Sequence, residues 1–268
     1  MIKQRLHFIN IKFIINVICY KNDMKRKIKV ILKSVLATFL IYFLLIVLGS
    51  LLMPYSAFSR SNAIRVIKFY CRVVFLILKV FLNISLDIRG IIPPNLPAII
   101  CSKHQSFLDV LILLYILPEP RFIMKLELTK IPIFSFYAKK IGCFSVQRNN
   151  KRGALNAMIE TIKKEQKESN GQLVIYPEGT RTKPGEQVEY KKGIDVLFSR
   201  LKRPLYLVST NSGLIWPKKD DFKHNGIVTM HFITRLNYKF KGSNNLLTIK
   251  KIIEEDSLVL YSNEKSRL

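Results

Sequence analysis

An uncharged, strongly apolar run covers residues 34–59, between Lys33 and Arg60. About 20 apolar residues are enough to cross the hydrocarbon layer of a bilayer. A buried core helix is the alternative, but such a helix rarely continues this far without a polar face. A cleaved signal peptide has a shorter apolar core, of roughly 7–15 residues, followed by an A-x-A-like site that is missing after this run. The run therefore predicts a helical membrane anchor.

Residues 61–83 predict a second helix that is basic along one side. Its four charges fall within roughly 60° of a helical wheel, and apolar side chains cover most of the remainder; the charged positions are Arg65, Lys68, Arg72 and Lys79. Such a helix suits the interface of an anionic membrane. Basic residues flank both ends of the apolar run, and cytoplasmic flanks are usually the basic ones. We therefore expect a re-entrant hairpin rather than a single span.

The sequence divides into an anchor and a globular part. We expect a basic N-terminal flank at residues 1–33, membrane-anchoring helices at 34–83 and a folded domain at 84–268. A mean hydropathy of +0.17 is high for a purely soluble protein but low for one that lies mostly within lipid, which agrees with this division. Met24 is a second candidate start, because a conventional basic flank follows it directly.

The chain is strongly basic, with 44 Lys and Arg against 18 Asp and Glu and a formal net charge of +26. This charge predicts an anionic partner: nucleic acid, lipid headgroups or a phosphorylated substrate. Nucleic acid is disfavoured, because no recognised nucleic-acid-binding motif and no aromatic–basic interleaving occurs outside the anchor. The four cysteines have neither CxxC nor Cys/His spacing, so we expect neither a metal site nor a disulfide framework.

After the anchor, short apolar runs alternate with helical stretches. Strands are predicted at 98–101, 122–124, 143–146, 173–176, 205–208 and 228–233, and helices at 106–117, 126–140, 153–168, 191–201 and from Asn245 onward. This alternation predicts an α/β fold with a β-sheet flanked by helices on both faces.

The first candidate site is His104, directly after a strand, with Asp109 five residues later at the start of a helix. Sites in open α/β sheets gather beyond the carboxyl ends of strands. Asp109 can accept the Nδ1 proton of His104, which leaves Nε2 facing a substrate hydroxyl. Ser106 and Asp109 also fit a helix-capping pattern that needs no catalysis. The motif alone leaves both interpretations open.

Two further clusters follow predicted strands. In the first, Glu178 and Gly179 begin a tight turn in which Thr180 and Arg181 can donate hydrogen bonds to phosphate oxygens. In the second, Arg148 ends a strand. A plain surface turn and a surface charge are the alternatives for each cluster alone. Together they would bring a base, a carboxylate and two arginines to one edge of a sheet.

These blocks, in this order, resemble the lysophospholipid acyltransferases, most of all the bacterial 1-acylglycerol-3-phosphate O-acyltransferases. The resemblance covers roughly residues 96–217. The matching blocks are His-x4-Asp at 104–109, Gly-x-x-Phe-x-x-Arg at 142–148 (here Gly-Cys-Phe-Ser-Val-Gln-Arg), Pro-Glu-Gly-Thr-Arg at 177–181, and a strand that opens at Pro204. The resemblance implies a mixed β-sheet flanked by helices, as in glycerolipid acyltransferases, behind a helical anchor.

The resemblance further implies that the chain transfers a fatty acyl group from acyl-CoA or acyl carrier protein to the sn-2 hydroxyl of 1-acylglycerol-3-phosphate, which gives phosphatidic acid. His104 would be the base and Asp109 its orienting group. The acceptor phosphate would bind residues Arg148, Glu178, Gly179, Thr180 and Arg181. No metal or other cofactor is expected. Membrane lipids would be partners, and the enzyme would lie on the inner (cytoplasmic) membrane with its site facing the cytoplasm.

Departures from the family's pattern leave the acceptor headgroup open. Lys103 stands where the family often has Asn, and Gln147 precedes Arg148 where a charged residue is common. If Lys103 lies near His104, its charge would disfavour the imidazolium and keep the base neutral. Another lysolipid, such as a lyso-ornithine lipid, is the alternative acceptor. A membrane-bound lipid hydrolase is the other alternative, although the G-x-S-x-G elbow of such enzymes is missing from the sequence.

Overall fold

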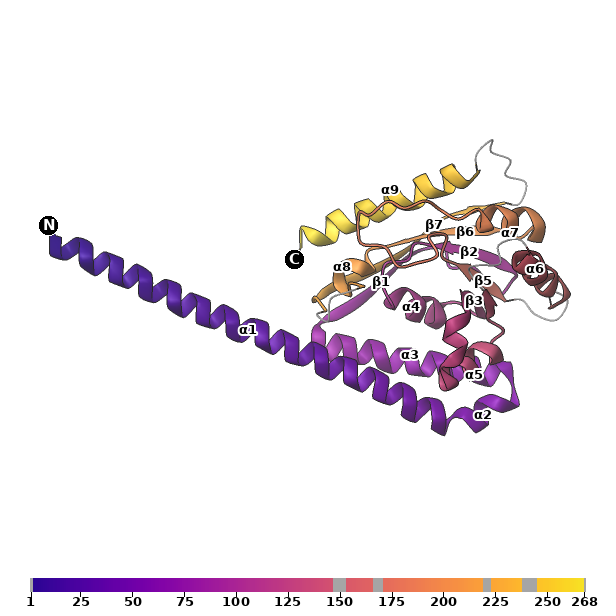
Figure 1. Cartoon of the computed structure of the whole chain (residues 1–268), viewed down its shortest axis with the longest axis horizontal. Coiled ribbons are helices and arrows are strands. Elements are labelled where there is room, and N and C mark those ends of the chain that lie inside the picture. The colour runs from indigo at the N-terminus through magenta and orange to yellow at the C-terminus, as the bar shows by residue number, and fades with distance from the viewer. Residues whose placement is uncertain (1, 147–152, 166–170, 219–222, 238–244, 268) are drawn as a thin grey trace.

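The computed structural model of the chain describes residues 2–146, 153–165, 171–218, 223–237 and 245–267. An N-terminal helical hairpin precedes a sheet covered by helices (Figure 1). The hairpin consists of α1 (Ile2–Leu51), α2 (Met53–Phe58) and α3 (Arg60–Leu82). Helix α1 continues through residues 2–33, for which the sequence predicts no regular element, and its amino-terminal part projects away from the sheet (Figure 1).

Local sequence sets the reversal between α1 and α3. Pro54 lies in the first turn of α2, where its missing N–H costs little. Ser59 is extended, and its hydroxyl caps α3 by accepting a hydrogen bond from the N–H of Asn62 at 3.0 Å. The two long helices therefore run back along each other.

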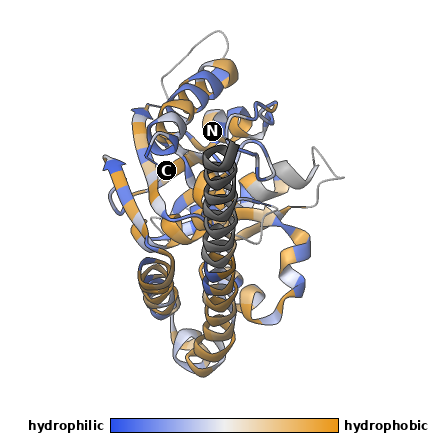
Figure 2. Ribbon diagram, turned by 90° about the vertical axis from the view of Figure 1, so that its left-hand side faces the viewer, coloured by the Kyte–Doolittle hydropathy of each residue, from blue (hydrophilic) through white to orange (hydrophobic). Residues whose placement is uncertain are grey.

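Helix α1 is tied along one face to α3 and to the globular part. The Tyr70 hydroxyl donates to the Ile41 carbonyl at 3.2 Å, and the Tyr137 hydroxyl donates to the Gly49 carbonyl at 3.0 Å. Further towards the amino terminus, the Lys223 ammonium donates to the Thr38 hydroxyl. The opposite face of α1 exposes large apolar side chains. The lower part of the α1 ribbon in Figure 2 is coloured orange, for hydrophobic residues. Within the described residues, Ile28–Leu51 is long and apolar enough to cross a membrane.

The seven strands form one mixed sheet in the order β1-β7-β6-β2-β5-β3-β4. All neighbouring strands are parallel except β6 and β7, which are antiparallel. The strands are β1 (Ile84–Gly90), β2 (Ala98–Ser102), β3 (Pro120–Lys125), β4 (Phe144–Val146), β5 (Gln172–Ile175), β6 (Leu205–Thr210) and β7 (Gly226–Leu236). The predicted mixed sheet is confirmed.

Helices cover both faces of this sheet (Figure 1). One face packs against α4 (Leu108–Ile116), which itself lies on α3. The other face packs against α6 (Gly153–Glu165), α7 (Gly193–Leu201) and the C-terminal helix α9 (Asn245–Lys265). Strand β2 is buried throughout, because apolar layers lie on both of its sides. His104 therefore follows a fully buried strand of the sheet.

Three elements of the globular part also differ from the sequence predictions. Strand β1 is an edge strand that was not predicted. The helix expected at 126–140 is divided into the 3-10 helix η1 (Leu126–Lys130) and α5 (Pro132–Lys140), because Pro132 begins a new helix and cannot donate a backbone hydrogen bond inside a longer one. A short helix, α8 (Ser212–Ile215), follows β6.

Candidate active site

The strand order brings three chain segments together at one edge of the sheet. Strand β2 lies between β5 and β6 and is parallel to both, so the carboxyl ends of all three strands meet. His104 follows β2, the turn at 178–181 follows β5, and Ser212 follows β6. The structure thus joins the His104 block and the Glu178 block as the sequence predicts. It adds Ser212, which was not singled out.

His104 and Asp109 form the central pair. The His104 Nδ1 lies 3.1 Å from Asp109 Oδ2. The Asp109 side chain is fully buried, whereas that of His104 is 16% exposed. Within the described residues, nothing hydrogen-bonds the Nε2 of His104. That nitrogen is the one available to a substrate.

Asp109 also organises the loop around it. Its Oδ2 accepts the backbone N–H groups of Gln105 at 2.7 Å and of Ser106 at 2.8 Å. Its other oxygen, Oδ1, accepts the hydroxyl of Ser212. The capping interpretation and the catalytic interpretation are therefore compatible, because one carboxylate both caps the loop before α4 and holds the imidazole.

The turn after β5 fixes the backbone of His104. The Glu178 Oε1 accepts the His104 N–H at 3.1 Å. On the other side, the His104 carbonyl accepts the Thr182 N–H at 2.8 Å and the Thr182 hydroxyl at 3.1 Å. Both polar backbone groups of His104 are thus held by a segment 74 or more positions away in the chain.

Glu178 points into the protein. Its side chain is fully buried, and its second oxygen, Oε2, has no hydrogen bond within the described residues. Burial raises the pKa of Glu178 to about 7, although the positive charge of Lys103 opposes the rise. In this geometry Glu178 supports the His104 loop. Its expected part in binding the acceptor stays a prediction.

The ring of Tyr176 stacks against the imidazole of His104. The rings of His104 and Tyr176 stack at 3.9 Å between centroids with an interplanar angle of 17°. Burial raises the pKa of Tyr176 well above its usual value, and the nearby carboxylates of Asp109 and Glu178 add to the rise. Tyr176 therefore stays neutral and limits the orientations open to the His104 ring.

Cations gather around the same turn. Gly179 has a positive φ of +67°, and a Cβ at this position would lie 2.8 Å from the Lys191 Nζ. The Lys218 ammonium donates to the Thr180 hydroxyl at 3.3 Å and to the Arg181 carbonyl at 2.8 Å. Two lysines that were not predicted thus join the expected phosphate-binding turn. Arg148 lies outside the described residues, and its predicted role is untested.

Lys103 is buried beside the base but is not an isolated charge. Its ammonium lies 2.6 Å and 2.8 Å from the two carboxylate oxygens of Glu254 on α9, and 3.5 Å from Glu178 Oε1. These carboxylates offset the positive charge on which the base-tuning role depends. That role stays a prediction. No group of three or more His, Cys, Asp or Glu side chains suited to a metal ion occurs in the described ranges.

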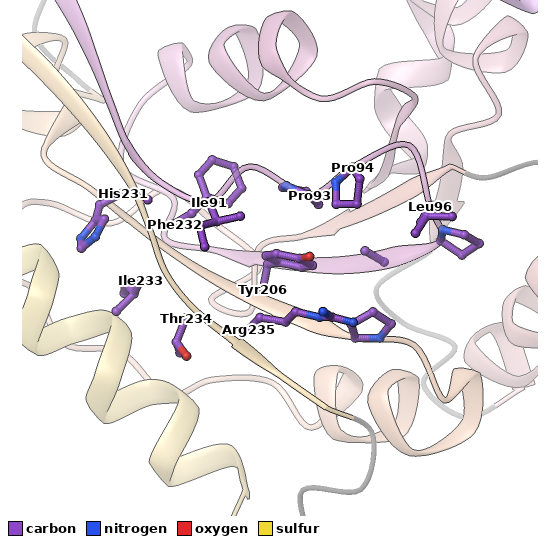
Figure 3. A pocket seen from close by; sticks show the side chains of 14 residues that line it. Ile91, Pro93, Pro94, Leu96, Tyr206, His231, Phe232, Ile233, Thr234 and Arg235 are labelled. Atoms are coloured by element: carbon purple, nitrogen blue, oxygen red, sulfur yellow. The ribbon is translucent and has the colours of Figure 1, made fainter.

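A separate hollow of about 420 Å³ lies at the other end of the sheet (Figure 3). It is bounded by the loop at 91–97, by the start of β2 and β6, and by the second half of β7. Tyr206 and Phe232 line it. Because β2 separates this hollow from His104, it is not part of the candidate active site.

The chain is similar in sequence to known acyltransferases. Residues 85–210 match the family model described as Acyltransferase. The chain is 26% identical over 168 residues to the 1-acyl-sn-glycerol-3-phosphate acyltransferase of Pseudomonas aeruginosa, a match that covers 61% of this chain and 63% of the relative. It is 27% identical over 167 residues to the enzyme of the same name from Cocos nucifera, with 62% and 52% covered. The matched segment thus spans roughly half to three fifths of these relatives.

A solved structure has the same fold. The crystal structure of the 1-acyl-sn-glycerophosphate (LPA) acyltransferase PlsC from Thermotoga maritima superimposes with a TM-score of 0.73 at 21% sequence identity. The similarity covers 88% of this chain and 97% of that one. It therefore extends beyond residues 85–210, which match the family model.

Proposed function

We propose that the protein transfers a fatty acyl group to the sn-2 hydroxyl of 1-acylglycerol-3-phosphate, which yields phosphatidic acid, and the match of residues 85–210 to the Acyltransferase family model supports this reaction class. The observation that supports this most is the His104–Asp109 pair at 3.1 Å, which leaves Nε2 facing outward. The names of the relatives support the choice of acceptor.

In the proposed reaction, His104 Nε2 removes the proton from the acceptor hydroxyl as its oxygen attacks the thioester carbonyl. The carbon–sulfur bond then breaks, and the thiol leaves with the proton from the imidazolium. The Asp109 carboxylate stabilises the imidazolium while it exists. A positioned base of this kind contributes roughly 10²–10⁴-fold to the rate. The reaction needs no cofactor besides the acyl donor, for which we propose acyl-CoA or acyl carrier protein.

The turn after β5 would bind the phosphate of the acceptor. Gly179, Thr180 and Arg181 can donate hydrogen bonds, and Lys191 and Lys218 add positive charge beside them. We propose that Arg148 and Glu178 assist. Two bound reactants held at His104 would react as in a nearly unimolecular step.

We also propose that the hairpin attaches the enzyme to the inner (cytoplasmic) membrane without crossing it. Contacts at Thr38 and Gly49 join α1 to the globular part, and Ile41 is bonded to Tyr70 of α3. These contacts support a hairpin whose two long helices lie on the same side of the membrane as the sheet. The active site would face the cytoplasm, where lipid substrates enter from the leaflet.

The first experiment measures thiol release and phosphatidic acid formation by detergent-solubilised protein supplied with acyl-CoA, with and without 1-acylglycerol-3-phosphate. We expect acceptor-dependent release that is lost in His104→Ala and kept in His224→Ala, whose side chain is exposed. Release without acceptor would indicate a hydrolase. If acyl-CoA and acyl carrier protein donors both give no product with this acceptor but do with another lysolipid, the choice of acceptor is wrong.

Orientation is tested with sealed membrane vesicles and an epitope tag at each end of the chain. The hairpin predicts that protease reaches both tags from the same, cytoplasmic side. Tags reached from opposite sides would indicate a single span.

A further inference from the structure

Lys103, the residue before the candidate base His104, carries a charge that is buried inside the protein. The Lys103 side chain is 1% exposed, and its ammonium is held by both oxygens of Glu254, whose side chain is 8% exposed. Glu254 lies on α9, beyond residues 85–210 that match the family model. The charge beside the base is therefore neutralised by a residue from outside the matched domain.

The Lys103 ammonium and the backbone N–H of His104 both contact the same oxygen of Glu178. The Glu178 Oε1 lies 3.5 Å from the Lys103 ammonium and also accepts the His104 N–H at 3.1 Å. The Tyr190 hydroxyl donates to Glu254 Oε1 at 2.9 Å and holds that carboxylate in place. Glu254 thus takes most of the ammonium's hydrogen bonding, which leaves Glu178 free to hold the loop.

Without the Glu254 charge, the ammonium would lose its nearest negative partner and keep at most one neutral acceptor there. A buried charge without a partner is strongly unfavourable, so the ammonium would move towards the remaining carboxylate. Among the described residues that carboxylate is Glu178, which already lies 3.5 Å away. Lys103 would then compete with the His104 N–H for the same oxygen, and the loop that carries the base would shift.

We infer that Glu254 is a positioning residue for acyl transfer: it neutralises Lys103 and thereby keeps Glu178 bonded to the backbone of His104. The inference rests on the proposed role of His104 as the base. It assigns to α9 a part in the active site, although α9 does not contribute an atom to the reacting groups.

A purely structural role for Glu254 is the alternative, in which it only docks α9 on the sheet. Helix α9 has other anchors that would remain: Glu264 accepts the Ile227 N–H at 2.7 Å, and Asp256 contacts His231 at 2.9 Å. The two roles differ in what the removal of Lys103 should do. If Glu254 acts by neutralising Lys103, removing both charges should restore the loop.

The test compares Glu254→Gln, the double variant Lys103→Met with Glu254→Gln, and the matched control Glu255→Gln. Glu255 is the neighbouring residue on α9, with a side chain that is 66% exposed. Each is assayed for kcat, for KM of the acceptor, for the pH profile of kcat/KM and for thermal stability, beside wild type and His104→Ala.

For Glu254→Gln we expect kcat to fall by roughly 10- to 100-fold, because a shift of the base by about 1 Å can cost 100-fold. The acceptor KM should change by less than about twofold, because Glu254 does not touch substrate. The acidic limb of the pH profile should move to lower pH, since a negative charge has been removed beside groups that bind protons. The other titratable groups that interact with this cluster are Glu178, Tyr190 and Cys101. A loss of folded protein alone would lower the amplitude without moving the limb.

The double variant should recover most of the lost kcat and the wild-type position of the limb, and Glu255→Gln should match wild type throughout. The inference fails if Glu254→Gln has the wild-type kcat and profile, if the folded double variant is as slow as the single one, or if neither variant folds. If His104→Ala is as active as wild type, the proposed function fails first.

Discussion

Asp109→Asn separates the two roles that the structure gives to Asp109. The carboxylate accepts the Nδ1–H of His104, two backbone N–H groups and the Ser212 hydroxyl. An asparagine with its amide oxygen towards the three N–H donors keeps those bonds, and its NH2 group can donate to the Ser212 hydroxyl. The loop should therefore keep its shape. What is lost is the negative charge beside the imidazolium.

The size of the effect follows from these contacts. A hydrogen bond to a charged group is worth about 1.5–3 kcal/mol, compared with about 1 kcal/mol for a neutral one. Loss of the charge during proton transfer removes the difference, about 0.5–2 kcal/mol, and should lower kcat by roughly two- to thirtyfold, since each 1.36 kcal/mol is a factor of about ten in rate. The free energy of unfolding should change by less than about 2 kcal/mol, because the donors stay paired.

The assay is acceptor-dependent thiol release by the variant, with the thermal unfolding temperature measured on the same preparation. Asp109→Ala is the comparison, because it leaves the backbone donors of Gln105 and Ser106 without their acceptor and should lower stability as well as kcat. A variant Asp109→Asn with wild-type kcat and a lowered unfolding temperature would refute the catalytic role. It would leave Asp109 as a loop cap alone.

Three further outcomes are expected. Burial raises the pKa of Glu178 to about 7, so the folded state keeps a proton that the unfolded state releases, and stability falls as pH rises between about 4.5 and 7. The unfolding temperature of Glu178→Gln should therefore rise relative to that of wild type as pH increases from about 5 to 8. A difference between the two unfolding temperatures that stays constant over this range would contradict this. Arg181→Ala should raise the acceptor KM by about tenfold or more through loss of a charged hydrogen bond, whereas exposed Lys183→Ala should not. His231→Gln should keep the wild-type kcat although His231 is also paired with an aspartate, at 2.9 Å; a loss of kcat with wild-type stability would indicate a second essential histidine.

Local patterns predicted every strand of the described sheet except β1, which lies at one edge. Strand β2 is an apolar run buried on both faces, and such a run can be recognised without its neighbours. Strand β1 contains Asp87 and Arg89, and it pairs with residues 226–232, far along the chain. A partly charged edge strand is defined by that distant pairing rather than by its own pattern.

The same limit applies to the site. The spacing of His104 and Asp109 predicted their contact, because both lie within one loop and the helix that follows it. The partner of Lys103 could not be predicted, since Glu254 is 151 positions away. Ser212 had a detectable signal: a hydroxyl directly after a predicted strand, within the fourth block that resembles the family. Its bond to Asp109 depends on strand order, which local pattern does not give.

The position of β1 sets an order of events during synthesis. Strand β1 (Ile84–Gly90) leaves the ribosome directly after the hairpin, but β7, with which it pairs, follows roughly 140 residues later. At roughly 5–20 residues per second the strand waits on the order of ten seconds for its partner. An unpaired strand edge is prone to aggregate, and the charged pair of Asp87 and Arg89 at 2.7 Å reduces that risk. Strand β7 and helix α9, which are made after the other strands of the sheet, therefore join β1 to β6 and deliver Glu254 to the site in the same step.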